Sequence, residues 1–330
     1  MRRESTEPGS GRQRGPCRAP PFAWVAAAGW PKLRPVHWQK VTVIGVGLLG
    51  GSLGMALRRR GLARQVVGFV RREAARGECR KARAVDDATT DLVEAVSDAD
   101  LVVLCTPLAQ MEPLARAMRG ALKPGAVVTD VGSVKGPVVR RLESLLKRAG
   151  AEFVGSHPMA GNERTGVGAA HADLFEGAVA VVTPTARTSA RALREVRRLW
   201  TGVGARVLEM GADEHDRLVS RSSHLPHVVA SALAALVLAP GRNPRQKDLC
   251  ATGFRDTTRV ASGSPEMWRD IALANRRHLD RALDELMREL GKVRKWLAAE
   301  DAEALFEFFQ VAKARRDAWC GSRRASPSPE

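Results

Sequence analysis

The segment VTVIGVGLLGGS, residues 41–52, decides the fold that we predict for this chain. A short apolar strand runs directly into Gly45-Val-Gly47-Leu-Leu-Gly50, and a helical pattern follows. This context is typical of a dinucleotide-binding turn. Gly45 permits the tight turn, Gly47 lets the backbone approach a pyrophosphate, and Gly50 lets the helix pack on the strand. The alternative is a glycine-rich turn that binds no ligand.

Outward from this turn, β-rich and amphipathic segments alternate over about 170 residues. The remaining predicted strands are 66–70, 101–107, 126–132, 152–158, 178–184 and 205–210, and the predicted helices are 51–60, 108–122, 134–149 and 188–201. The alternation predicts an α/β domain with a Rossmann-type, doubly wound, mostly parallel sheet.

After Ala212 the β-rich segments stop. Helices are predicted at 213–239, 244–262 and 266–318, the last broken near Gly291. We therefore expect a dinucleotide-binding domain at 39–211 and an all-α domain at 212–319. Residues 1–38 and 320–330 have the composition of disordered segments, and an organelle-targeting role for 1–38 stays open.

The end of the second predicted strand bears on which nicotinamide cofactor is bound. Sites for NAD usually carry an acidic residue there, which binds the ribose 2′-hydroxyl. Here Arg71 and Arg72 follow the strand, and the first acidic residue is Glu73. Two guanidinium groups favour the 2′-phosphate of NADP, although both could also be surface charges. Further candidate cofactor contacts are Leu48 and Thr106.

Composition limits the other classes of function. The net charge of +17 permits a basic nucleic-acid-binding protein as a remote alternative, but no aromatic-interleaved basic patch occurs. No apolar run reaches the length of about 18 residues that a membrane helix needs. Five scattered cysteines without a CxxC pair indicate a reducing compartment and no zinc site. We expect a cytoplasmic protein that binds no nucleic acid, membrane or metal.

Two polar clusters follow predicted strands, where open α/β sheets bind their ligands. The first contains Ser133 and Lys135; the simpler interpretation is that Ser133 is an N-cap and Lys135 a surface charge. The second begins at His157 and includes Glu163. Pro158 holds His157 extended at the sheet edge, where an imidazole can accept a proton near neutral pH.

Two more clusters lie in the helical part. Ser223 and His227 flank Pro226, which should kink the helix, and such a kink suits a site better than a structural helix. The segment from Gly253 to Trp268 contains Asp256 and Arg259. Arg259 can bind a carboxylate with two parallel hydrogen bonds, unless it only pairs with Asp256 on the helix surface.

Together, GVGLLGGS, DVGSVK, HPMAGNE, SHLPH and GFRDTTRVASGSPEMW, in this order, resemble the prephenate dehydrogenase family, which includes the arogenate dehydrogenases. The resemblance covers roughly residues 40–318. It implies oxidative decarboxylation of the anionic substrate prephenate to 4-hydroxyphenylpyruvate, in tyrosine biosynthesis, with hydride transfer to NAD or NADP. Arogenate is the alternative substrate, since no residue decides between the two.

The resemblance also assigns roles to residues. His157 would accept the proton of the substrate 4-hydroxyl, Ser133 would assist there, and Arg259 would anchor a carboxylate. The residues that would complete the substrate pocket are His227, Ser223, Asp256, Glu163 and Trp268. A homodimer through the helical domain is implied as well. A 3-hydroxy-acid dehydrogenase would lack the pair of motifs around His157 and Arg259, and a non-catalytic nucleotide-binding regulator would not need His157, Ser133 and Arg259 together.

Overall fold

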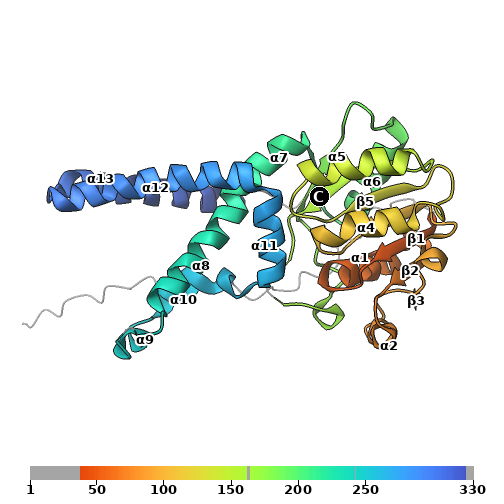
Figure 1. Ribbon diagram of the computed structural model, residues 1–330, viewed down its shortest axis with the longest axis horizontal. Coiled ribbons are helices and arrows are strands. Elements are labelled where there is room, and N and C mark those ends of the chain that lie inside the picture. Colours follow the sequence, from red (N-terminus) through yellow and green to blue (C-terminus); the bar gives the residue numbers. More distant parts are fainter. Residues whose placement is uncertain (1–37, 162–163, 242, 325–330) are drawn as a thin grey trace, which may run out of the picture. The chain divides into compact units, whose positions relative to one another are not determined.

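The computed structural model describes residues 38–161, 164–241 and 243–324. A six-stranded parallel sheet forms the centre of the α/β part (Figure 1). Its strands are β1 (Trp38–Ile44), β2 (Ala63–Phe69), β3 (Asp87–Thr89), β4 (Leu101–Leu104), β5 (Val127–Asp130) and β6 (Glu152–Phe153). The spatial order β3-β2-β1-β4-β5-β6 is that of the Rossmann dinucleotide-binding fold, so the predicted fold class is confirmed.

Apolar side chains cover both faces of this sheet. Val41 and Val43 of β1 belong to one buried cluster, and Ile44 belongs to the other, because successive side chains of a strand point to opposite faces. The helices of this part are α1 (Leu48–Arg59), α2 (Glu73–Lys81), α3 (Leu92–Val96), α4 (Leu108–Met118), α5 (Gly136–Lys147), α6 (Ala190–Gly202) and the 3-10 turn η1 (Val167–Ala169). The sequence patterns missed α2, β3 and α3, which are short.

The segment 152–158 was predicted as one strand, and this was wrong. It divides at Val154 into β6, the last strand of the parallel sheet, and β7 (Gly155–Pro158). β7 pairs antiparallel with β8 (Val179–Thr183), and β8 pairs parallel with β9 (Arg206–Glu209). The side chain of Asp130 replaces ladder bonds at the division, because its Oδ1 accepts the Ser156 amide at 3.0 Å.

The helical part begins with α7 (Ala212–Val219), a π-helical turn η2 (Ser220–His224) and α8 (Leu225–Val237). It continues with α9 (Arg245–Asp248), α10 (Thr252–Thr258), the 3-10 turn η3 (Arg259–Ser262), α11 (Pro265–Ala274), α12 (Arg276–Ala298) and α13 (Ala302–Arg324). Helices α12 and α13 lie side by side (Figure 1). The irregular turn lies just before Pro226, where a proline removes a backbone hydrogen bond.

The predicted break near Gly291 was wrong. Gly291 lies inside α12, since a helix tolerates an isolated glycine at a cost of about 1 kcal/mol. The breaks occur at Asn275 and at Glu300, whose φ of 51° ends the helix in the left-handed region. α13 runs to Arg324, beyond residue 319 where the sequence placed the end of the helical domain. In the described part of the chain, no helix combines the length and the apolar character needed to cross a membrane.

Candidate active site

The glycine turn between β1 and α1 has the geometry that a bound pyrophosphate requires. Gly45 has a φ of 94°, which favours glycine, and a Cβ at Gly50 would lie 2.1 Å from the Gly45 carbonyl oxygen. Around Gly47 the space is open, since a Cβ there would meet no described heavy atom within 4 Å. Gly47 is also the N-cap of α1 and offers no side-chain cap, so the first amides of the helix can bind an anion.

Two further predicted cofactor residues lie beside this turn. Leu48 is the first residue of α1, and Thr106 follows β4, where its methyl group contacts the glycine turn. The Thr106 hydroxyl is buried and has no hydrogen-bond partner among the described residues. A buried hydroxyl without a partner is costly, so a ligand that hydrogen-bonds to it fits here. The open glycine turn and this hydroxyl together fit a dinucleotide.

Arg71 and Arg72 follow β2, as predicted, and both are exposed. Arg72 is the N-cap residue of α2, and its guanidinium lies 3.6 Å from Glu78. The first acidic side chain after the strand, Glu73, is paired with Arg76 at 2.8 Å. The end of β2 is therefore followed by two exposed guanidinium groups, and the carboxylate of Glu73 is already paired with Arg76.

The structure corrects both simpler interpretations of the cluster after β5. Ser133 does not cap a helix, because α5 begins at Gly136 and has Lys135 as its N-cap residue. Lys135 is not a surface charge, because its side chain is fully buried. Its Nζ pairs with Asp130 and donates to the Ser156 carbonyl at 2.7 Å. Burial lowers the pKa of Lys135, and Asp130 opposes this shift. The buried pair supports the strand that carries His157.

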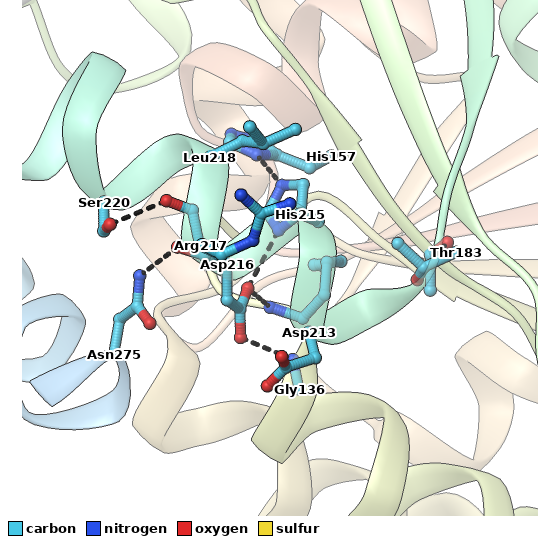
Figure 2. Close-up of polar contacts among 12 residues, drawn as sticks. Gly136, His157, Thr183, Asp213, His215, Asp216, Arg217, Leu218, Ser220 and Asn275 are labelled. Carbon is cyan, nitrogen blue, oxygen red and sulfur yellow. Dashed lines mark hydrogen bonds and ion pairs between the residues drawn. The ribbon is translucent and has the colours of Figure 1, made fainter. Parts of the chain in front are cut away.

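His157 lies on β7 and is joined to α7 by a chain of hydrogen bonds (Figure 2). Its Nδ1 is 2.9 Å from Nε2 of His215, and Nδ1 of His215 is 2.8 Å from Oδ1 of Asp216. Burial lowers the pKa of His157 well below its ordinary value of 6.5, and His215, Lys135 and His224 lower it further. His157 is therefore neutral near pH 7, as a proton acceptor must be.

Asp216 also joins the helical part to the sheet. Its carboxylate accepts the backbone amides of Lys135 at 2.7 Å and Gly136 at 2.8 Å, and so caps the N-terminus of α5. The side-chain amide of Asn275 donates to the Asp216 carbonyl at 2.8 Å and to Nδ1 of His224 at 3.0 Å. A single buried network thus runs from β7 to the start of α12.

His227, one of the predicted residues around Pro226, lies against Trp268. The rings of His227 and Trp268 are stacked with centroids 3.4 Å apart, and His224 packs edge-on against the same indole at 6.1 Å. Burial lowers the pKa of His224 to about 4 and also lowers that of His227, which the Ser223 backbone partly opposes. Nε2 of His224 and Nε1 of Trp268 are buried without a hydrogen-bond partner among the described residues. Both nitrogens suit the polar groups of a substrate.

The remaining predicted substrate residues fall into three cases. Arg259 is close enough to His227 for its charge to lower the pKa of that imidazole. Asp256 is exposed on α10, and its carboxylate lies 3.9 Å from Nε of Arg255. Glu163 lies outside the described residues. The structure therefore places Arg259 within electrostatic range of His227, and leaves Asp256 at the surface.

Residues missed by sequence reasoning are His215, Asp216, His224 and Asn275. The first two stand in the segment GADEHDRLV, where a charged helix start is the ordinary interpretation. His215 and Asp216 are 0% and 3% exposed, but burial of a polar helix residue depends on its partners and adds nothing to the apolar periodicity. His224 lies within the motif SHLPH, but only Ser223 and His227 of this motif were predicted as site residues.

Comparisons with known proteins agree with this geometry. Residues 53–209 match the family model described as the nucleotide-binding domain of prephenate dehydrogenase, and residues 211–311 match its dimerization domain. Prephenate dehydrogenase of Bacillus subtilis is 36% identical over 279 residues, 84% of this chain and 75% of that protein.

Two solved structures are also similar. Prephenate dehydrogenase from Aquifex aeolicus, in complex with hydroxyphenyl propionate and NAD+, has a TM-score of 0.80 and 33% identity, over 85% of this chain and 98% of that one. The arogenate dehydrogenase of Synechocystis has a TM-score of 0.72 and 31% identity, over 85% of this chain and 99% of that one.

Proposed function

The chain belongs to the prephenate dehydrogenase family, and we propose that it converts prephenate to 4-hydroxyphenylpyruvate and CO2 with a nicotinamide dinucleotide as oxidant. The observation that carries this proposal is the neutral His157, held by His215 at the edge of a Rossmann sheet. An alcohol oxidation needs a base at the hydroxyl and a hydride acceptor at the carbon, and this arrangement offers a place for each.

In the proposed reaction His157 acts at the 4-hydroxyl of the substrate. Its Nδ1 is engaged with His215, so Nε2 takes the hydroxyl proton as C4 loses hydride. When bound, the nicotinamide supplies the hydride acceptor. The bond from the ring to its carboxylate breaks, CO2 leaves, and the electron pair makes the ring aromatic. His157 then returns the proton to the phenolate oxygen, and Ser133 assists at the same oxygen.

The other proposed substrate contacts come from the helical part. Arg259 binds a substrate carboxylate, and the cluster of His227, Ser223 and Trp268 receives the side-chain end. The stacking of His227 on Trp268 supports these roles because it fixes the imidazole within electrostatic range of Arg259. Asp256 and Glu163 would complete the pocket.

Arogenate is the second candidate substrate. It differs from prephenate by an amino group in place of the side-chain keto oxygen, so the chemistry at C4 is the same. The similarity to the Synechocystis arogenate dehydrogenase supports this candidate.

Product analysis tests the proposed reaction. The full chain with prephenate and oxidised nicotinamide should form one CO2 and one 4-hydroxyphenylpyruvate for each reduced nicotinamide. Formation of reduced nicotinamide without CO2 would show an ordinary alcohol oxidation and contradict the proposal. Tyrosine formed from arogenate at a higher kcat/KM would favour the second candidate.

We further propose NADP as the preferred cofactor, since Arg71 and Arg72 end β2 and Glu73 is paired with Arg76. Replacing both arginines with serine should raise the KM for NADP by about tenfold or more, because each charge-assisted contact contributes about 1.5–3 kcal/mol. The KM for NAD should change less than about threefold.

The control for this prediction is Arg80→Ser, which removes an exposed positive charge from α2, the helix that follows Arg71 and Arg72. It should leave both KM values within about twofold, since long-range effects of exposed charges are screened by salt. An equal rise in both KM values for the double variant would mean that the arginines do not bind a 2′-phosphate.

We propose that residues 39–211 form the dinucleotide-binding domain and that a helical, dimerising domain begins at residue 212 and includes α13, which ends at Arg324. The last strand ends at Glu209 and α7 begins at Ala212, which supports this boundary. Ala230 is the one buried residue in the described helix α8. Packing in the core of one chain therefore does not explain why the side chains of this helix are mostly apolar. Other large apolar side chains are exposed on α11 to α13, among them Leu273, Met287, Leu297, Phe306 and Phe309.

A dimer predicts a molar mass of twice 35.7 kDa in light scattering after size exclusion. Exposed apolar surface of this extent usually marks an interface. A charge placed in it, as in Leu236→Glu on α8, should shift the mass toward that of one chain, whereas Leu208→Glu on β9, another exposed leucine, should not. A mass of 35.7 kDa at micromolar concentration for the unaltered chain would contradict the dimer.

A further inference from the structure

We propose that Asp216 and His215 are positioning residues that hold His157 in the tautomer with a proton on Nδ1 and a lone pair on Nε2. The inference rests on the proposed function, because it concerns the base of that reaction. The two residues act through hydrogen bonds from α7 to β7, and neither needs to touch the substrate (Figure 2).

The first step is the state of Asp216. Two backbone amides, those of Lys135 and Gly136, donate to this carboxyl group, and Nδ1 of His215 lies 2.8 Å from its Oδ1. Oδ1 accepts from the Lys135 amide and Oδ2 from the Gly136 amide. An ionised carboxylate has only acceptor sites, which matches these partners. The hydrogen bond between Asp216 and His215 therefore requires Nδ1 of His215 to carry a proton.

The second step follows along the chain. A neutral imidazole carries one proton, so a proton on Nδ1 of His215 leaves its Nε2 as an acceptor. The partner of that Nε2, at 2.9 Å, is Nδ1 of His157, which must then be the donor. The neutral His157 ring has its lone pair on Nε2, the nitrogen that the proposed reaction uses.

The groups around His157 explain why its tautomer has to be fixed by a hydrogen bond. Buried groups face it from three elements: His215 from α7, Lys135 from the start of α5 and His224 from η2. Lys135 is fully buried and has Asp130 as its ion-pair partner. Among the described residues, His157 has no direct hydrogen bond to a carboxylate, and its hydrogen-bonded connection to Asp216 runs through His215. The Asp216 charge also stabilises the imidazolium that forms when His157 takes the proton.

Two substitutions at His215 separate the loss of its hydrogen bond to His157 from the loss of its side chain as a whole. Asparagine places its side-chain amide near the position of Nδ1, so His215→Asn keeps the contact with Asp216 and removes the acceptor for His157. Glutamine reaches the position of Nε2, so His215→Gln keeps an acceptor for His157. Because Asp216 also caps α5, Asp216→Asn costs stability, and the His215 variants test the proposal without removing that cap.

The first experiment reads the tautomer without turnover. The full chain labelled with ¹⁵N-histidine has seven histidines, and the His157 signals are assigned by their absence in His157→Asn. Long-range ¹H–¹⁵N correlation should show His157 with a protonated Nδ1 and an unprotonated Nε2, and Asp216→Asn or His215→Asn should raise the population of the opposite tautomer. A proton on Nε2 of His157 in the unaltered chain overturns the proposal, whatever the substrate proves to be.

The second experiment measures prephenate oxidation. Loss of the correct tautomer should lower kcat by about 10²–10⁴-fold in His215→Asn, with KM within about threefold, while His215→Gln stays within about tenfold of the unaltered chain. Asp213→Asn is the matched control on the same helix, with a side chain 79% exposed, and should change kcat less than twofold. Equal loss of kcat in both His215 variants would mean that the pair is only structural. Absence of prephenate turnover in the unaltered chain would refute the proposed function and leave the tautomer result standing.

Discussion

Replacing His157 with asparagine is expected to lower kcat for prephenate by about 10³-fold or more. General-base catalysis contributes about 10²–10⁴-fold, and the asparagine side chain cannot take a proton. The variant should keep its fold, because an asparagine amide can donate to Nε2 of His215 in place of Nδ1. Steady-state kinetics measure the loss, and circular dichroism together with nicotinamide titration verify the fold and the cofactor site.

The acid side of the pH profile provides an independent check on the same residue. Burial and the neighbouring His215, Lys135 and His224 lower the pKa of His157, so the base stays unprotonated below pH 6.5. The kcat/KM of the unaltered chain should therefore begin to fall only below that pH. A fall centred above pH 7, or a His157→Asn variant with more than a tenth of the normal kcat, would remove His157 from the role of base.

Replacing Lys135 with methionine is expected to lower the free energy of unfolding by about 3–5 kcal/mol. The side chains of Lys135 and Asp130 are both 0% exposed, and removal of one partner leaves a buried charge without compensation. Denaturant unfolding measures the loss. Activity should fall as well, because Lys135 also holds the Ser156 carbonyl, next to His157.

The double variant Asp130→Asn/Lys135→Met separates the charge from the packing. Replacing both members of a buried pair is often close to neutral, so the double variant should be more stable than Lys135→Met alone. Lys123→Met is the matched control, because its pair with Asp100 is partly exposed and contributes little. If Lys135→Met cost no more than Lys123→Met, the buried pair would not stabilise this fold.

The local part of the fold could be predicted from the sequence. The strand, glycine turn and helix at 41–52 carry their own pattern, and the alternation that follows specifies a parallel sheet. The division of 152–158 into β6 and β7 could not be predicted, because it depends on a hydrogen bond that the Asp130 side chain accepts from the Ser156 amide. The helix end at Asn275 was missed for a similar reason, since Asn275 is held by Asp216 and His224.

The candidate site divides in the same way. His157 was predicted because a strand end and Pro158 place it at the sheet edge. His215 and Asp216 were not, because their partners Lys135, Gly136 and His157 are 58 or more residues away in the chain. The simpler interpretation of Lys135 as a surface charge had the same origin, since burial of a lysine is visible only once its partner Asp130 is in place.

The measurement that tests the central claim most directly is the initial rate of nicotinamide reduction by the purified full chain. Prephenate and arogenate are each crossed with NAD and NADP, with His157→Asn as the blank. The account predicts turnover with prephenate, faster with NADP than with NAD, and almost none in the blank. Absence of turnover in all four combinations, from a chain that binds nicotinamide dinucleotide and is folded, would contradict it.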